Sequence, residues 1–156
     1  MLARVASVTV LPDQERLVIE SACRDLIARY AVLVDDGRAD EVPHLFTEDG
    51  SWTAPGVTME GRDELVAGFG RRARNTSRVS RHVCTNFHLS QVTEDEALGS
   101  VYLTLFRHDR DGGGEGAPPD ARPALVGVYR DRFVCLDGRW LIANRRLEVD
   151  FIGAPT

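Results

Sequence analysis

The chain has few cysteines and no metal-binding pattern. Cys23, Cys84 and Cys135 are the only three among 156 residues, they are widely separated, and no two of them form a CxxC pair. Because such a set makes neither a disulfide framework nor a zinc site, we expect small core residues in a reducing cytoplasm. The sequence also lacks the helical HxxxH and HExxH spacings, so no metal is expected.

Long apolar runs are absent as well. No stretch of roughly 18 or more apolar residues exists, which excludes the pattern of a transmembrane helix. Residues 1–11 are too few, and lack the basic region followed by an apolar one, to predict a signal peptide. We therefore expect a cytoplasmic protein that does not enter the membrane.

The chain has no excess of positive charge. Its 19 basic and 24 acidic residues give a net charge of -5 and a pI near 5.4, whereas nucleic-acid binders carry a basic patch. No nucleic-acid partner is expected. One segment holds a local run of arginines, for which a solvated helix end and loop is the favoured interpretation: Arg71, Arg72, Arg74, Arg78 and Arg81.

The first half of the chain has helical patterns. The length suits one domain, spanning 1–156. Apolar residues recur at helical spacing from 17 to 34, with Asp13 as the expected N-cap and Gly37 as the stop. A short helix is predicted over 40–46, a strand over 51–54 after a turn at 47–50, and a third helix from 61 through 69.

The second half has the patterns of strands. Val, Leu, Tyr and Phe recur in the four predicted strands, 82–92, 97–108, 124–136 and 139–150. Residues 93–96 and Asp137-Gly138 are hairpin turns, and 109–123 is a flexible loop rich in Gly and Pro. Helices followed by antiparallel strands predict an α+β domain, with helices packed on one face of a curved sheet.

A carboxylate at the end of an apolar helix needs a partner. Asp35 lies at the C-terminal end of the first helix, where the macrodipole disfavours negative charge. Tyr30 continues the buried stripe of that helix, so both side chains are expected to reach the interior. A buried carboxylate is costly unless it is paired. On strand alternation, His82 shares a face with Cys84, Asn86 and His88.

A set of motifs extends from about Glu15 to Asp150: Tyr30, 34–37, 45–50, 61–62, 81–82 with Asn86, 127–129 and 137–140. Together they resemble the SnoaL-like domain of the nuclear transport factor 2-like superfamily. The resemblance extends to scytalone dehydratase and bile acid 7α-dehydratase. It implies a cone-shaped α+β barrel, a curved mixed or antiparallel sheet wrapped around three N-terminal helices. It also implies a homodimer or homotrimer that uses the sheet's outer face.

The resemblance assigns a catalytic dyad and a pocket. Asp35 and His82 match the dyad of the dehydratases, and Tyr30 matches a tyrosine of the bile acid enzyme. Tyr30 is equally well explained as a core aromatic. His108 falls near a second pocket histidine after a one-residue shift, which reverses the face of a strand residue. Gly127 and Tyr129 replace a serine and an asparagine of the scytalone dehydratase pocket, which argues against scytalone as substrate.

The other predicted pocket residues can each be explained without a role in the pocket. By alternation Arg145 shares a face with Leu141, Ala143 and Leu147. The positions of Arg145 and Leu147 line the pocket of scytalone dehydratase, so Arg145 is expected to contact a substrate carbonyl or carboxylate. A surface salt bridge explains it equally well. Trp52 and Phe69 are expected as pocket walls, although core packing also explains them.

These residues favour a cofactor-independent lyase or isomerase acting on a hydrophobic polycyclic, polyketide-like or steroid-like substrate. His82 would transfer protons, because imidazole has the side-chain pKa nearest neutrality. Asp35 would orient it and Tyr30 would donate a hydrogen bond to the substrate oxygen. The alternative is a non-catalytic binding or assembly module, such as a ring-hydroxylating dioxygenase small subunit.

Overall fold

A six-stranded sheet curves around one long helix. The computed structural model describes residues 11–110, 116–117 and 121–153. Its helices are α1 (Asp13–Asp35), the 3-10 helix η1 (Ala39–Leu45) and α2 (Gly61–Arg74). The strands are β1 (Phe46–Ala54), β2 (Val57–Glu60), β3 (Arg78–Val92), β4 (Glu96–Asp109), β5 (Leu125–Leu136) and β6 (Arg139–Ile152).

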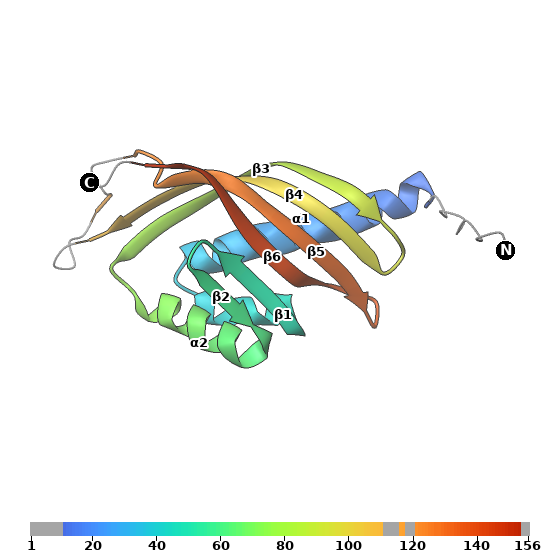
Figure 1. The fold of residues 1–156 in the computed structure, drawn as a ribbon, viewed down its shortest axis with the longest axis horizontal. Helices are drawn as coiled ribbons and strands as arrows, with labels where there is room; N and C mark the ends of the chain where they lie inside the picture. Colours follow the sequence, from blue (N-terminus) through green and yellow to red (C-terminus); the bar gives the residue numbers. More distant parts are fainter. Residues whose placement is uncertain (1–10, 111–115, 118–120, 154–156) are drawn as a thin grey trace.

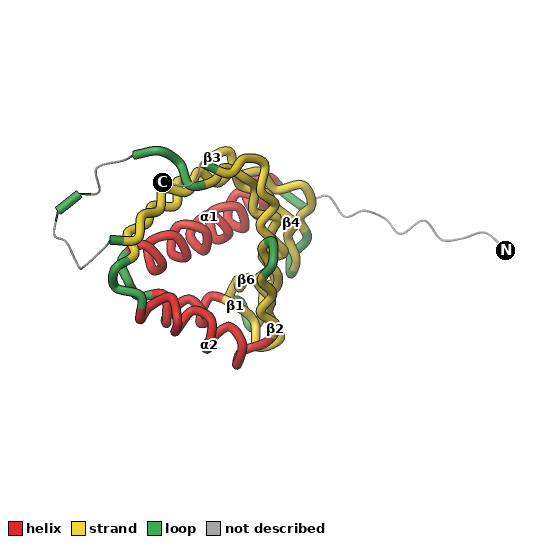
Figure 2. The backbone as a smooth tube through the Cα atoms, turned by 60° about the vertical axis from the view of Figure 1, so that its left-hand side comes forward, coloured by secondary structure: helices red, strands yellow, loops and turns green. Residues whose placement is uncertain are grey.

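The strand order is β2-β1-β6-β5-β4-β3. All neighbours pair antiparallel except β1 and β6, which pair parallel. The sheet curves over α1, while α2 lies below the short strands β1 and β2 (Figures 1 and 2). The predicted α+β fold, with three helices and a curved mixed sheet, is confirmed, but the sheet stays open and does not close into a barrel.

Helix α1 is held by one apolar face and a glycine stop. Its buried face runs from Ile19 to Val34 and includes Tyr30, whereas the predicted first member of the stripe, Leu17, is 65% exposed. Gly37 has φ 79° and lets the Arg38 amide donate to the Leu33 carbonyl at 2.8 Å, the bond that closes a Schellman turn. The expected N-cap is wrong by one residue, since the cap position is Pro12 and no side chain caps the helix.

The strand predictions are confirmed, with ends that differ by a few residues. The segment predicted as a turn, 47–50, instead belongs to β1, and β2 was not predicted. Asp137 and Gly138 both have positive φ, 51° and 76°, as a two-residue type I′ hairpin requires. About half of the loop predicted over 109–123 lies outside the described residues.

A bulge in β3 reverses the facing of its second half. The pairing of β3 with β4 shifts between Thr85 and His88, and Asn86 has φ 53°. Before the bulge His82 faces inward, and after it Leu89 does. Asn86 and His88 are therefore exposed, and the prediction that they share a face with His82 is wrong.

No helix among the described residues is long and apolar enough to span a membrane.

Candidate active site

Asp35 ends α1 directly against the inner face of β3. Its Oδ1 lies 2.7 Å from Nδ1 of His82 and accepts a hydrogen bond from the Ser80 hydroxyl at 2.7 Å. Its Oδ2 accepts the backbone N–H of His82 at 2.7 Å. The Asp35 and His82 side chains are only 8% and 9% exposed. The carboxylate at the unfavourable end of the helix is thus fully hydrogen-bonded by β3.

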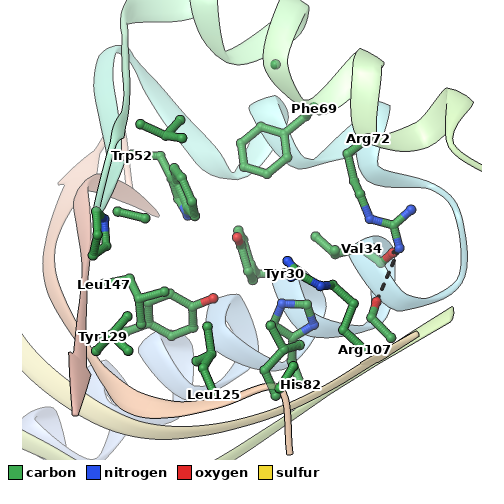
Figure 3. A pocket seen from close by; sticks show the side chains of 18 of the residues that line it. Tyr30, Val34, Trp52, Phe69, Arg72, His82, Arg107, Leu125, Tyr129 and Leu147 are labelled. Atoms are coloured by element: carbon green, nitrogen blue, oxygen red, sulfur yellow. Dashed lines mark hydrogen bonds between the residues drawn. The ribbon is translucent and has the colours of Figure 1, made fainter. Parts of the chain in front are cut away.

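These contacts keep the carboxylate ionised. Burial pushes the pKa of Asp35 upward, but the side chain and backbone of His82, followed by Ser80, outweigh it and hold the pKa below its usual value. The ring nitrogen Nδ1 of His82 is committed to Asp35. No described residue hydrogen-bonds to Nε2, and the imidazole points into a cavity (Figure 3).

The lowered pKa of Asp35 predicts a pH-dependent contribution to stability. A carboxylate with a lowered folded-state pKa stabilises the fold above its unfolded value, about 3.9, and this contribution is lost as the pH falls through the folded pKa. The free energy of unfolding of the wild type minus that of Asp35→Asn should therefore shrink as the pH falls below about 4. Urea unfolding at stepped pH measures this difference. A difference that does not change down to about pH 2 would contradict the ionised, stabilised carboxylate.

The cavity has a volume of about 570 Å³ and is bounded by α1, α2 and the inner face of the sheet. Most of its lining is apolar. Six of the predicted site residues line it, and Figure 3 shows them around one space: Tyr30, Trp52, Phe69, His82, Tyr129 and Leu147.

Tyr30 occupies the centre of an aromatic cluster. Its ring meets those of Phe69, His82 and Tyr129 edge to face, with centroids 6.0, 6.1 and 5.9 Å apart. Burial raises the pKa of both Tyr30 and Tyr129, so both phenols keep their protons and can donate hydrogen bonds. The indole N–H of Trp52 is buried without a hydrogen-bond partner. Tyr30, Trp52 and Tyr129 thus place polar groups in the mainly apolar part of the cavity.

Arg145 supports this cluster from behind the cavity. It is fully buried, and its guanidinium binds the Asp131 carboxylate at 2.8 and 2.7 Å. Its Cζ lies 4.4 Å from the ring centroids of both Tyr30 and Tyr129. Burial lowers the pKa of Arg145, but Asp131 outweighs it and raises the pKa above its usual value. Arg145 is therefore neither on the surface nor among the cavity-lining residues.

Two other predicted residues also lie away from the cavity. Asn86 is exposed beyond the β3 bulge. His108 pairs across the ladder with Val79, and its neighbour Arg107 lines the cavity instead. The one-residue shift that the alignment of His108 required reverses its face.

Sequence reasoning missed Ser80 and Arg107. Ser80 is two residues before His82 and therefore on the same face, but the strand was predicted to begin at His82. Arg107 pairs directly with Ser80 across the ladder. Arg72 completes this group, because it donates to Ser80 Oγ at 3.2 Å and to the Val34 carbonyl at 3.2 Å. Alternation from a strand start at 78 would have placed Ser80 beside His82, and alternation along 97–108 would have placed Arg107 on the face of Leu103 and Leu105.

The described residues contain no cluster of three His, Cys, Asp or Glu side chains that could hold a metal ion. The fold and the site define a cone-shaped α+β protein in which a carboxylate–imidazole pair borders a largely apolar cavity. The chain belongs to the SnoaL-like domain family, whose model matches residues 15–146.

Solved structures share this fold. The chain is similar to an aspartate-to-asparagine variant of Rv3472, a protein of unknown function from Mycobacterium tuberculosis (27% identity, TM-score 0.73, covering 91% of this chain and 78% of that one). It is also similar to a candidate scytalone dehydratase from Novosphingobium aromaticivorans (23% identity, TM-score 0.75, covering 90% of this chain and 89% of that one). A third similar structure is the beta subunit of a candidate aromatic-ring-hydroxylating dioxygenase from the same organism (21% identity, TM-score 0.73, covering 90% of this chain and 94% of that one). No curated protein matches.

Proposed function

We propose that the protein is a cofactor-independent lyase or isomerase that removes a proton next to a carbonyl of a hydrophobic small molecule and, as a dehydratase, expels water. The observation that carries this is the 2.7 Å contact between Asp35 and His82 Nδ1, which leaves Nε2 directed at a largely apolar cavity. The family and the fold shared with a candidate scytalone dehydratase support it.

The proposed reaction needs one base, one orienting group and one donor. His82 Nε2 takes the proton on the carbon next to the carbonyl, and Asp35 stabilises the imidazolium that forms. The electron pair of the broken C–H bond enters the carbonyl system as an enolate, to which Tyr30 donates a hydrogen bond. Collapse of the enolate forms the C=C bond and breaks the C–O bond to the β-hydroxyl, which leaves as water with the proton of His82. Return of that proton to carbon instead gives isomerisation.

The cavity supports a ring compound as substrate. Its volume, about 570 Å³, lies within the range of roughly 300–1,000 Å³ for small-molecule sites. Aromatic walls with few polar groups suit a polycyclic, polyketide-like or steroid-like body. The free thiols of Cys23, Cys84 and Cys135 support the proposal of a cytoplasmic location.

A simple probe tests the proton transfer. A β-hydroxytetralone, which dehydrates to a naphthol, should exchange its α-proton in D₂O and form the naphthol faster with the wild type than with buffer, followed by NMR. His82→Gln should slow both by about 10²-fold or more, the usual contribution of a general base. His88→Gln is the matched control, since His88 is exposed on the same strand. Equal rates for wild type and His82→Gln would refute the proposed base.

The second candidate is a binding or assembly module. The shared fold with a dioxygenase beta subunit favours it. Co-purification with a larger iron–sulfur protein would support this alternative. A homodimer or homotrimer by light scattering, active without a partner, would support the proposed enzyme.

A further inference from the structure

One end of the cavity is lined by arginines. Arg71, Arg72, Arg78 and Arg107 line it, and no Asp or Glu among the described residues does. Three of these belong to the run for which a solvated helix end was the favoured interpretation. Since the whole chain has a net charge of -5, this concentration of positive charge runs against its overall charge and focuses the local potential.

Most of these charges have no contacting carboxylate. Arg78 binds Asp109 at 2.6 and 2.7 Å. Arg72 donates only to neutral oxygens of Val34, Asn75 and Ser80. Arg71 and Arg107 form no ion-pair contact with any residue that the structure describes, although the charge of Asp109 acts on Arg72 and Arg107 without contact. Asp35, the nearest carboxylate on α1, is already occupied by Ser80 and His82.

Arg78 repels Arg72, although Asp35 and Asp109 act on Arg72 in the opposite direction. Burial, followed by the charge of Arg78, lowers the pKa of Arg72. An anion placed among these side chains would relieve that repulsion and find planar N–H donors, which suit an oxyanion.

The position of the arginines orients a ligand. Arg107 pairs across the ladder with Ser80, and Leu105 with His82, so Arg107 is diagonal to His82 on the inner face. Figure 3 shows Arg72 and Arg107 at one end of the cavity, Trp52 and Leu147 at the other, and Tyr30 and His82 between them. A ring system against the apolar end would therefore place an attached anionic group at the arginines.

We propose that the ligand of this site is an amphipathic anion, an apolar ring compound with a carboxylate or similar oxyanion group that Arg107 and Arg72 bind. The inference rests on the proposed function for the identity of the site, and it names the class of substrate. The ring would lie beneath Trp52 and Phe69, with the reacting carbon beside His82.

Calorimetric titration with matched probes tests this. Anthracene carboxylate and the isosteric anthracene carboxamide differ in charge and little else. At low salt the wild type should bind the carboxylate about 10-fold or more tightly than the amide, and added salt should reduce this preference. Anthracene sulfonate and an anthracenyl phosphate then rank the oxyanions.

Variants test whether Arg107 produces the preference for the carboxylate. Arg107→Met should reduce the carboxylate preference to about twofold or less, whereas Arg107→Lys, which keeps the charge, should retain most of it. Arg130→Met is the matched control because Arg130 is half exposed, binds Glu148 and changes the net charge equally. Its preference should equal that of the wild type.

Binding requires no proton transfer, so the outcome is independent of the proposed reaction. His82→Gln should keep the carboxylate preference. Retained preference together with absent α-proton exchange in the wild type would leave this inference standing and refute only the lyase. A wild type that does not prefer the carboxylate, including one that binds neither probe, overturns the inference, as does a preference that Arg107→Met leaves unchanged.

Discussion

Replacing Asp35 by Asn is expected to lower turnover by about 10⁴-fold while the protein stays folded. The reason lies in the three hydrogen bonds that the carboxylate accepts. The backbone N–H of His82, which binds Oδ2, can only donate, so the amide oxygen of the Asn variant must remain there. The NH₂ group then takes the place of Oδ1, opposite His82 Nδ1.

This exchange forces the wrong tautomer of His82. An NH₂ group donates to Nδ1, which puts the ring proton on Nε2, the nitrogen that must accept the substrate proton. Ser80 can adapt, because its hydroxyl can reverse and accept. Thus the geometry survives while the base is lost.

The measurement is kcat for the β-hydroxytetralone, with circular dichroism as the folding check. Asp36→Asn is the matched control, since Asp36 is the next residue and is exposed; its turnover should equal that of the wild type. An Asp35→Asn variant that retains more than about a tenth of wild-type turnover would rule out this role for the carboxylate.

Replacing Arg145 by Met should reduce the free energy of unfolding by about 3–5 kcal/mol. Arg145 and Asp131 have fully buried side chains joined by two hydrogen bonds. Removal of the guanidinium leaves the Asp131 carboxylate unpaired in the core and also removes the cation that lies between two tyrosine rings.

Two further variants test whether the loss of stability comes from the buried ion pair between Arg145 and Asp131. The double variant Arg145→Met with Asp131→Leu should recover most of the lost stability, because apolar groups of similar size can replace a buried ion pair. Arg146→Met, at an exposed ion pair with Glu148, should cost about 1 kcal/mol or less. Urea unfolding compares all three. A single Arg145→Met variant as stable as Arg146→Met would refute the structural role of the buried pair.

Much of the fold could be predicted from local pattern. The apolar periodicity of α1, its glycine stop at Gly37 and the hairpin at Asp137-Gly138 are set by residues close in sequence. These signals reflect the physical chemistry of helix ends and tight turns, and the structure agrees with them. The resemblance to a family then brought Asp35 and His82 together across 47 residues.

The errors lie where strands deviate from strict alternation. Leu136 pairs with Arg139 across the turn, so an unbroken ladder would set Arg145 opposite Arg130. A register shift between Arg132 and Phe133 instead brings Asp131 to Arg145. The β3 bulge likewise turns Asn86 outward. Asn tolerates positive φ more readily than most residues, but nothing local shows that the strand uses this freedom, so tertiary pairing decides it.

The hydrogen bonds of the Asp35 carboxylate also affect which residues related chains keep as they evolve. All three of its hydrogen bonds come from Ser80 and His82 of β3, and one of them comes from main chain that any residue at position 82 except proline would supply. A descendant that abandons the chemistry can lose the imidazole and still need the aspartate to fasten α1 to the sheet. We expect the aspartate to persist in inactive relatives, so its presence alone does not mark an enzyme, and position 82 is the one at which active and inactive relatives should differ.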